Sequence, residues 1–179
     1  MGEIKSTLDI IMEKAKGLTV TEQEKEAFKK KEIEGKVKGL FQKLLDGAMD
    51  VERLKSEMAA FGAEQRGIAR EALLSECLGS MNPQADNESI LRVLEHVLDM
   101  DPAPFRRIIQ EFHEDLQKEK GAREKAMIGR LKKAGVSGTA VIPNINADPE
   151  WGGYVAQAEE AFRRKLDSLG DKFLLSKFS

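Results

Sequence analysis

The C-terminal part of the chain carries the pattern that most restricts its fold. Apolar side chains recur there at intervals of three and four residues, at Trp151, Val155, Ala158, Phe162, Leu166, Leu169 and Phe173. This spacing places them along one face of an α-helix and is close to the heptad repeat of packed helices. A strand would need apolar residues at every second position. The pattern therefore predicts a helix over residues 149–176 that packs against another helix.

The composition indicates helices in the rest of the chain. Ala, Glu, Lys, Leu and Arg account for 86 of the 179 residues, which is typical of long or coiled helices. Residues that favour strands are scarce, with 8 Val, 4 Thr, 1 Tyr and 1 Trp. We expect an all-α, elongated, multi-helix protein that has little or no β structure and ends in a long antiparallel helical hairpin.

Helix-start signals mark where these helices begin. Thr21 and Glu24 have the spacing of a capping box. Asp50 and Asn87 are residue types that cap helices, and Pro follows Asp at 101–102 and 148–149. We expect helices over about 21–46, 50–61, 63–82, 87–98, 102–134 and 149–176. A further short helix is marked by Leu8, Ile11, Met12 and Ala15.

Two features of this pattern bear on the organisation of the chain. Residues 79–87 have the composition of a linker, so we divide the chain into an N-terminal helical segment, 1–82, and a helical body, 86–179. The first segment includes a charged arm, 25–34. The helix over 102–134 is either continuous or broken at Gly121, and the following helix is its partner in the hairpin.

Known catalytic and metal-binding motifs are missing from the sequence. Cys77 stands among leucines, which favours a small buried residue over a nucleophile. Neither His96 nor His113 has a Glu three residues before it or a second histidine four residues away, the helical spacings that metal sites use. Glycine-rich phosphate loops and nucleophile elbows are also missing. We expect no catalytic residue, no bound cofactor and no metal.

The chain offers no stretch of about 18 apolar residues, the length that a membrane span requires. Its start is charged rather than apolar, unlike a secretory signal. A single cysteine fits a reducing compartment. We expect a cytoplasmic protein that does not bind membranes.

The net charge of −2 conceals an uneven distribution. Residues 95–115 hold six acidic and two basic side chains, and 118–133 hold seven basic and two acidic ones. The basic residues are Lys118, Lys120, Arg123, Lys125, Arg130, Lys132 and Lys133. Such a stripe can neutralise nucleic-acid phosphates. The alternatives are a solvated helix face and an ionic match to an acidic partner helix.

The longest irregular stretch, 136–150, is a second candidate contact site, because long loops in helical proteins are often functional. Val141, Ile142, Pro143 and Asn144 could be extended and bind a partner, with Trp151 as a neighbouring anchor. In the alternative, Val141, Ile142 and Ile145 fold back and cover the end of the hairpin.

The first third of the chain resembles a known group of proteins. The segment from Gly2 to Lys14, followed by Gly17-Leu18-Thr19 and a helix rich in Glu and Lys, is similar to small bacterial helical proteins of unknown function. The resemblance implies no particular activity.

These observations together predict a non-enzymatic interaction or scaffolding protein that binds a protein partner or itself. Self-association would use the apolar seam from Trp151 to Phe173 or the charged arm. The alternative is a nucleic-acid-associated protein that uses residues 118–133.

Overall fold

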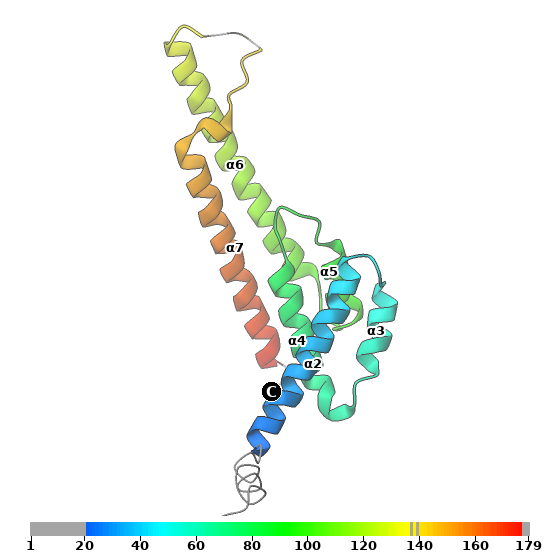
Figure 1. The fold of residues 1–179 in the computed structure, drawn as a ribbon. Coiled ribbons are helices and arrows are strands. Elements are labelled where there is room, and N and C mark those ends of the chain that lie inside the picture. Colours follow the sequence, from blue (N-terminus) through cyan, green and yellow to red (C-terminus); the bar gives the residue numbers. More distant parts are fainter. Residues whose placement is uncertain (1–20, 137, 139, 177–179) are drawn as a thin grey trace, which may run out of the picture.

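The computed structural model describes residues 21–136, 138 and 140–176, and all regular structure in these ranges is helical. The prediction of an all-α fold is confirmed (Figure 1). The elements are α2 (Glu22–Leu45), α3 (Val51–Ala59), α4 (Ala63–Ser80), α5 (Glu88–His96), α6 (Ala103–Lys133), the 3₁₀ turn η1 (Ile145–Ala147) and α7 (Pro149–Ser176). The expected helix at Leu8–Ala15 lies outside the described residues.

Two of the predicted caps form as expected. The Thr21 hydroxyl accepts a hydrogen bond from the Glu24 backbone N–H, and the Glu24 carboxylate accepts one from the Thr21 backbone N–H. The Asp50 carboxylate accepts a hydrogen bond from the Arg53 backbone N–H at 2.7 Å. These bonds satisfy N–H groups that have no partner within the helix, so they fix where α2 and α3 begin.

The prediction that Asn87 caps α5 is wrong. Its side chain is buried and turned back into the preceding loop, where its amide nitrogen donates to the carbonyls of Asn82 (2.7 Å) and Ala85 (2.9 Å). Its amide oxygen accepts from the Asn82 backbone N–H at 3.0 Å. Asp86 instead accepts from the first N–H of α5, at Glu88. Asn87 thus holds the loop between α4 and α5 in a fixed conformation.

Helices α2 to α5, the start of α6 and the end of α7 share one hydrophobic core, which we call the body. It includes Phe41, Leu54, Leu73, Leu94, Phe105 and Leu166 as fully buried side chains. Buried residues from both sides of the 82–86 loop belong to this core. The loop therefore connects two parts of the chain that share this core.

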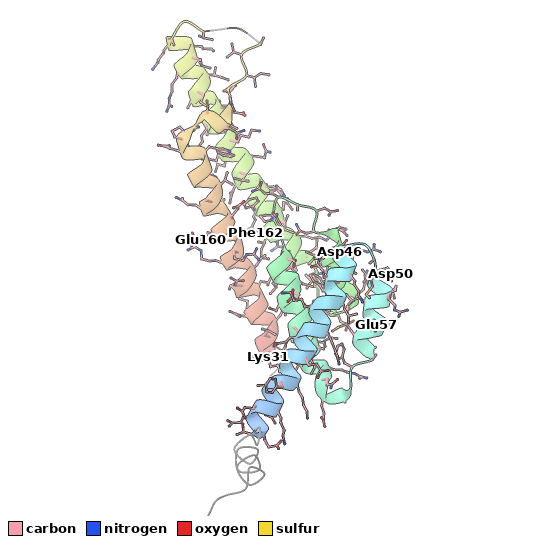
Figure 2. The ribbon with its side chains drawn as sticks, in the orientation of Figure 1. Lys31, Asp46, Asp50, Glu57, Glu160 and Phe162 are labelled. Carbon is pink, nitrogen blue, oxygen red and sulfur yellow. The ribbon has the colours of Figure 1, made fainter. Side chains whose placement is uncertain are left out.

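Helices α6 and α7 run antiparallel (Figure 1). Phe112 of α6 and Phe162 of α7 meet edge to face with ring centroids 5.7 Å apart, and Phe105 stacks on Phe173 at the same distance. In Figure 2, Phe162 lies on the side of α7 that faces α6, and Glu160 lies on the opposite side. Helix α6 is continuous through Gly121, so the alternative of a break there is wrong.

Arginine side chains join the helices of the body at their C-terminal ends. Arg163 of α7 donates to the carbonyls of Leu78 (2.7 Å) and Met81 (3.2 Å) at the end of α4. Arg70 of α4 donates to the Leu98 carbonyl, which follows α5. The Arg163 guanidinium satisfies carbonyls at the end of α4, where the negative end of the helix dipole lies, and Arg70 binds a carbonyl of the loop after α5. Arg163 thereby fixes the lower part of α7 against the body.

Beyond the body the two long helices continue alone, as Figure 1 shows. We call residues 113–161 the projecting hairpin. Every described side chain in this range is half-buried or exposed, whereas Phe112 and Phe162, directly below it, are buried. The hairpin therefore differs physically from the body to which it is attached.

Candidate interaction surface on the projecting hairpin

The projecting hairpin has large apolar side chains that it does not enclose. They are Leu116, Met127, Ile128, Leu131, Val141, Ile145, Trp151, Tyr154 and Val155, all half-buried. The partly buried apolar residues that pack on the core reach only to Leu116 on α6 and Ala158 on α7. The apolar residues nearer the tip thus form a separate set, which two helices and a loop cover incompletely.

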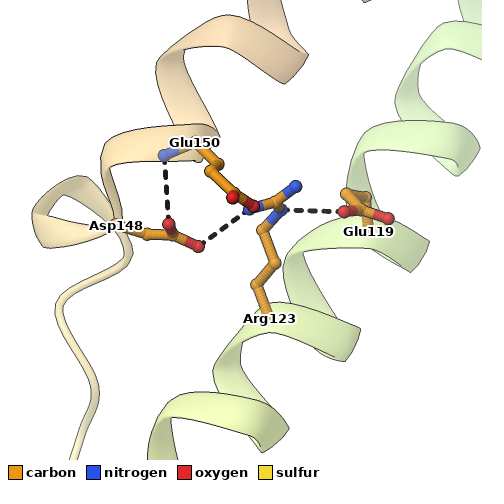
Figure 3. Close-up of polar contacts among 4 residues, drawn as sticks. All are labelled: Glu119, Arg123, Asp148 and Glu150. Carbon is orange, nitrogen blue, oxygen red and sulfur yellow. Dashed lines mark hydrogen bonds and ion pairs between the residues drawn. The ribbon is translucent and has the colours of Figure 1, made fainter.

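Arg123 holds the hairpin together through three carboxylates (Figure 3). Its Nε donates to Glu119 at 2.7 Å, and its Nη1 lies 3.0 Å from Asp148 Oδ2 and 3.2 Å from Glu150 Oε2. The Arg123 side chain is only 19% exposed and that of Asp148 only 13%. The hydrogen bond from Arg123, with a smaller contribution from the Glu150 backbone N–H, lowers the pKa of Asp148. We call these four residues the Arg123 cluster.

The Arg123 cluster sets the alignment of the two helices. Asp148 accepts a hydrogen bond from the Glu150 N–H at 3.1 Å, as the Asp-Pro start signal predicts, and its second oxygen binds Arg123. The beginning of α7 is therefore level with Arg123 on α6. Residues 124–133, the last turns of α6, extend past the start of α7 (Figure 1), and the described residues 140–148 lead back from the tip to that start.

The residues of the predicted basic stripe differ in their partners and exposure. Arg123 pairs within the hairpin, as described above, so it is not available to a partner in this conformation. Lys118, Lys125 and Lys132 are exposed and lie seven residues apart, which places them along one line on α6. Lys120 lies 3.9 Å from Glu124, and Arg130, Lys132 and Lys133 are exposed near the tip. Residues 125–147 contain four basic side chains and no acidic one.

Helix α6 is polarised along its length. Its projecting part begins with Glu114 and Asp115 and ends with Lys132 and Lys133, all four exposed. Within the described residues, none of these four has an oppositely charged side chain within 4 Å. By contrast, Glu111 just below pairs with Lys165 at 2.7 Å. The acidic pair thus lies at the body end of the projecting part of α6 and the basic pair at its tip, and the exposed bases Lys118, Lys125 and Arg130 between them have no acidic side chain within 4 Å among the described residues either.

The loop mainly folds back over the end of the hairpin, which is the second of the two arrangements that the sequence predicted. Val141 and Ile145 are half-buried, and η1 packs against both α6 and α7. Ile142 points outward with 88% of its surface exposed, and Pro143 is half-buried. Asn144 is exposed and accepts a hydrogen bond from the Asn146 N–H. The described part of the segment covers the end of the hairpin and leaves two large apolar side chains, Val136 and Ile142, exposed to solvent.

Two separate hollows lie on one side of the hairpin between α6 and α7. A hollow of about 220 Å³ near the body is lined by Asp115, Tyr154, Gln157 and Ala161 among others. A second hollow, of about 320 Å³, lies nearer the tip and is lined by Ala122, Ala126, Arg130 and Pro149 among others. Asp115, Ala122 and Ala126 are seven and four residues apart, so both hollows adjoin the same face of α6. We call the two hollows together the hairpin groove.

Trp151 and Tyr154 form the aromatic part of this surface. Their rings stack with centroids 6.1 Å apart, and both side chains are half-buried. Partial burial, together with the nearby carboxylates of Glu119 and Asp115, raises the pKa of Tyr154. Trp151 was expected as an anchor beside the loop. The sequence did not single out Tyr154, although it lies one helical turn from Trp151.

The seam from Trp151 to Phe173 packs largely within the chain. Phe162 and Leu166 are buried in the body, and Ala158, Leu169 and Phe173 pack against its core. The seam is therefore not a free surface in its lower part. The charged arm, 25–34, forms the first turns of α2, where Phe28 is 65% exposed.

Other candidate chemistry has no counterpart in the described ranges. Cys77 is fully buried, and burial raises the pKa of its thiol. No group of three or more His, Cys, Asp or Glu side chains in the described part of the chain could hold a metal ion. None of the described helices is both long and apolar enough to cross a lipid bilayer.

Comparisons with known proteins identify no relative of this chain: no family model, curated protein or solved structure matches it.

Proposed function

We propose that this chain is a non-enzymatic, cytoplasmic interaction protein in which the body supports the projecting hairpin and the hairpin binds a protein partner. One observation carries the proposal. Every described side chain of residues 113–161 is half-buried or exposed, and these include Met127, Leu131, Trp151 and Tyr154.

The number of neighbouring elements limits how much of a helix can be covered. An amphipathic helix is stable when its apolar face packs against another element. In the body, each helix has neighbours on several sides. In the projecting hairpin, α6 has only α7 and the loop beside it, so the flanks of the contact remain open. A partner in the hairpin groove would bury these flanks, and burial yields about 25 cal/mol per Å² of apolar surface.

Site-specific photo-crosslinking in cells that produce the full chain would test this proposal. A photoreactive residue at Gln157, an exposed residue that lines the hairpin groove, should give a crosslinked protein. The same residue at Lys55, on the exposed face of α3, serves as the matched control and should give little product. Equal labelling from both positions, or none from Gln157, would contradict the proposal.

A nucleic-acid-associated role is the second candidate, and the charge of residues 125–147 favours it. Four basic side chains without an acidic neighbour in that segment could neutralise phosphates and release counterions. The double variant Lys132→Glu with Lys133→Glu should then abolish a gel shift of RNA or DNA, and added salt should weaken that shift. If the unmodified chain produces no shift at low salt, this candidate is removed.

A further inference from the structure

The charges and small residues of α6 identify one particular partner for the hairpin. We infer that two copies of this chain pair through their projecting hairpins, antiparallel and groove to groove, and form a four-helix bundle. This inference rests on the proposed function, because it names the occupant of the same surface.

Four exposed residues on the groove side of α6 carry the argument. Asp115, Ala122, Ala126 and Lys133 are separated by seven, four and seven residues, which places them on one face of the helix. Read from the body to the tip, these four residues present an acid, two alanines and a base, and Arg130, which lines the hollow nearer the tip, adds a second base at that end. An antiparallel copy presents a base, two alanines and an acid. The face is therefore complementary to its own reverse.

The spacing also defines the register. If a twofold axis passes beside residue 124, Asp115 of one copy lies opposite Lys133 of the other, and Ala122 lies opposite Ala126. Glu114 and Lys132 are offset from this register by only two residues. By symmetry each contact occurs twice, as in a closed twofold dimer. The overlap spans residues 115–133, which is about 27 Å of helix at 1.5 Å per residue.

The groove has the shape that such a pairing needs. Ala122 and Ala126 are exposed, and Gly129 on the same side of α6 has no atom within 4 Å of where a Cβ would lie. Small side chains allow two helices to approach closely, as in the packing of helical bundles. The groove reaches down to Ile108 and Lys165, beside the body, so it spans the length over which the two helices would overlap.

The same surface is less suited to nucleic acid. Asp115 lines the lower part of the groove, Glu114 is the next residue on α6, and Glu119 lies nearby within the Arg123 cluster. These carboxylates would repel phosphates that followed the groove from the basic tip to the body. Against a second copy they face lysines instead. Charge complementarity therefore favours this chain as its own partner.

A charge-exchange experiment with the full chain tests the inference. Two variants are needed. The tip variant is Lys132→Glu with Lys133→Glu, and the body-end variant is Glu114→Lys with Asp115→Lys. Sedimentation equilibrium of the unmodified protein should give twice the chain mass of 19.9 kDa. Either variant alone should weaken self-association roughly 10- to 100-fold, because each attraction becomes a repulsion at two symmetric places.

Restored association is the decisive result. An equimolar mixture of the two variants should form a heterodimer, because each reversed end then meets its complement, and the fourfold variant should self-associate again. A double variant with the same charge change on the body, Lys38→Glu with Lys55→Glu, is the control and should dimerise like the unmodified protein. Circular dichroism spectra would verify that each variant is folded.

Three outcomes would overturn the inference. A monomeric unmodified protein does so, and the proposed function then survives only if Gln157 crosslinks to a different protein. A dimer that neither variant weakens places the interface elsewhere. RNA or DNA binding by a monomer, lost in the tip variant and not recovered in the fourfold variant, would replace self-pairing with the nucleic-acid role.

Discussion

At the scale of single residues, Arg123 has the most influence on the projecting hairpin. The sequence places it in a basic stripe, but the fold surrounds it with Glu119, Asp148 and Glu150. Ion pairs between exposed side chains contribute little, whereas a network around one half-buried guanidinium orders several groups together. The cluster also gives Asp148 two tasks, since it caps α7 and binds α6.

Replacing Arg123 should loosen the start of α7 without affecting the body. In Arg123→Met, three carboxylates lose their shared cation, so amide hydrogen exchange at residues 149–155 should accelerate roughly three- to tenfold. Exchange in α4 should be unchanged. Lys125→Met removes an exposed base two residues away and is the matched control. Equal effects from the two variants would mean that the Arg123 cluster does not fix the hairpin.

The cluster should also respond to acid. The pKa of Asp148 is lowered in the fold. Ionised Asp148 therefore contributes fully to the stability of the folded protein at pH values above its unfolded pKa, about 3.9. This contribution disappears as the pH falls through the lower, folded value. An NMR titration of the Asp148 carboxyl should give a midpoint below 3.9 in the unmodified protein. In Arg123→Met the midpoint should move upward; an unchanged midpoint would show that Arg123 is not its cause.

Cys77 should be inert in the folded protein. It is fully buried, and a thiol reacts mainly as its thiolate, which burial disfavours by raising the pKa. A thiol-specific reagent at pH 8 should therefore modify Cys77 only at the rate at which the body unfolds, and rapidly in denaturant. Fast modification of the native protein would place Cys77 at an accessible surface.

At the scale of elements, α6 is a single helix despite two glycines in its projecting part. Glycine in a helix interior costs about 0.5–1 kcal/mol relative to alanine. Gly121 has open space where a Cβ would lie, whereas a Cβ at Gly170 of α7 would come within 2.5 Å of Leu78 Cδ1. The two positions differ in packing although both are helical.

Gly121→Ala should therefore stabilise the protein by about 0.5–1 kcal/mol in urea unfolding. Gly170→Ala is the comparison: its gain in helix propensity should be cancelled or reversed because Leu78 must shift. Destabilisation by Gly121→Ala would indicate that α6 has a close neighbour at Gly121 in solution.

Much of the fold follows from local sequence, and the differences have identifiable causes. Cap residues and apolar spacing predicted α2, α3, α6 and α7 to within a few residues, because both signals act inside one helix. Asn87 was misassigned because the same side chain can cap a helix or close a loop. The helical period of 3.6 residues alone could not show that Arg123 is paired within the hairpin whereas Lys125 is exposed, because this difference depends on where α7 begins.

The interaction surface is harder to predict for the same reason. The acidic and basic halves of 95–133 were evident in sequence, but the groove appears only when α7 lies beside α6. Tyr154 acquires its surroundings from Asp115 and Glu119, which are distant in sequence. The seam from Trp151 to Phe173 gave no sign of which of its residues the body would bury.

At the scale of the whole molecule, a body with one enclosed core carries a hairpin in which no described side chain is buried. We expect the two parts to differ in stability when the hairpin has no partner, because its amides open without breaking the core. Pairing with a second copy would remove this difference, and it would do so by mass action.

Hydrogen exchange at two protein concentrations tests this most directly. Between about 1 μM and about 100 μM protein, protection of amides in residues 113–133 and 149–161 should rise, while that of α2 and α4 stays constant. The rise should be absent in the tip variant and present again in the fourfold variant. Protection of the hairpin equal to that of the body at both concentrations would contradict the claim that the hairpin needs a partner.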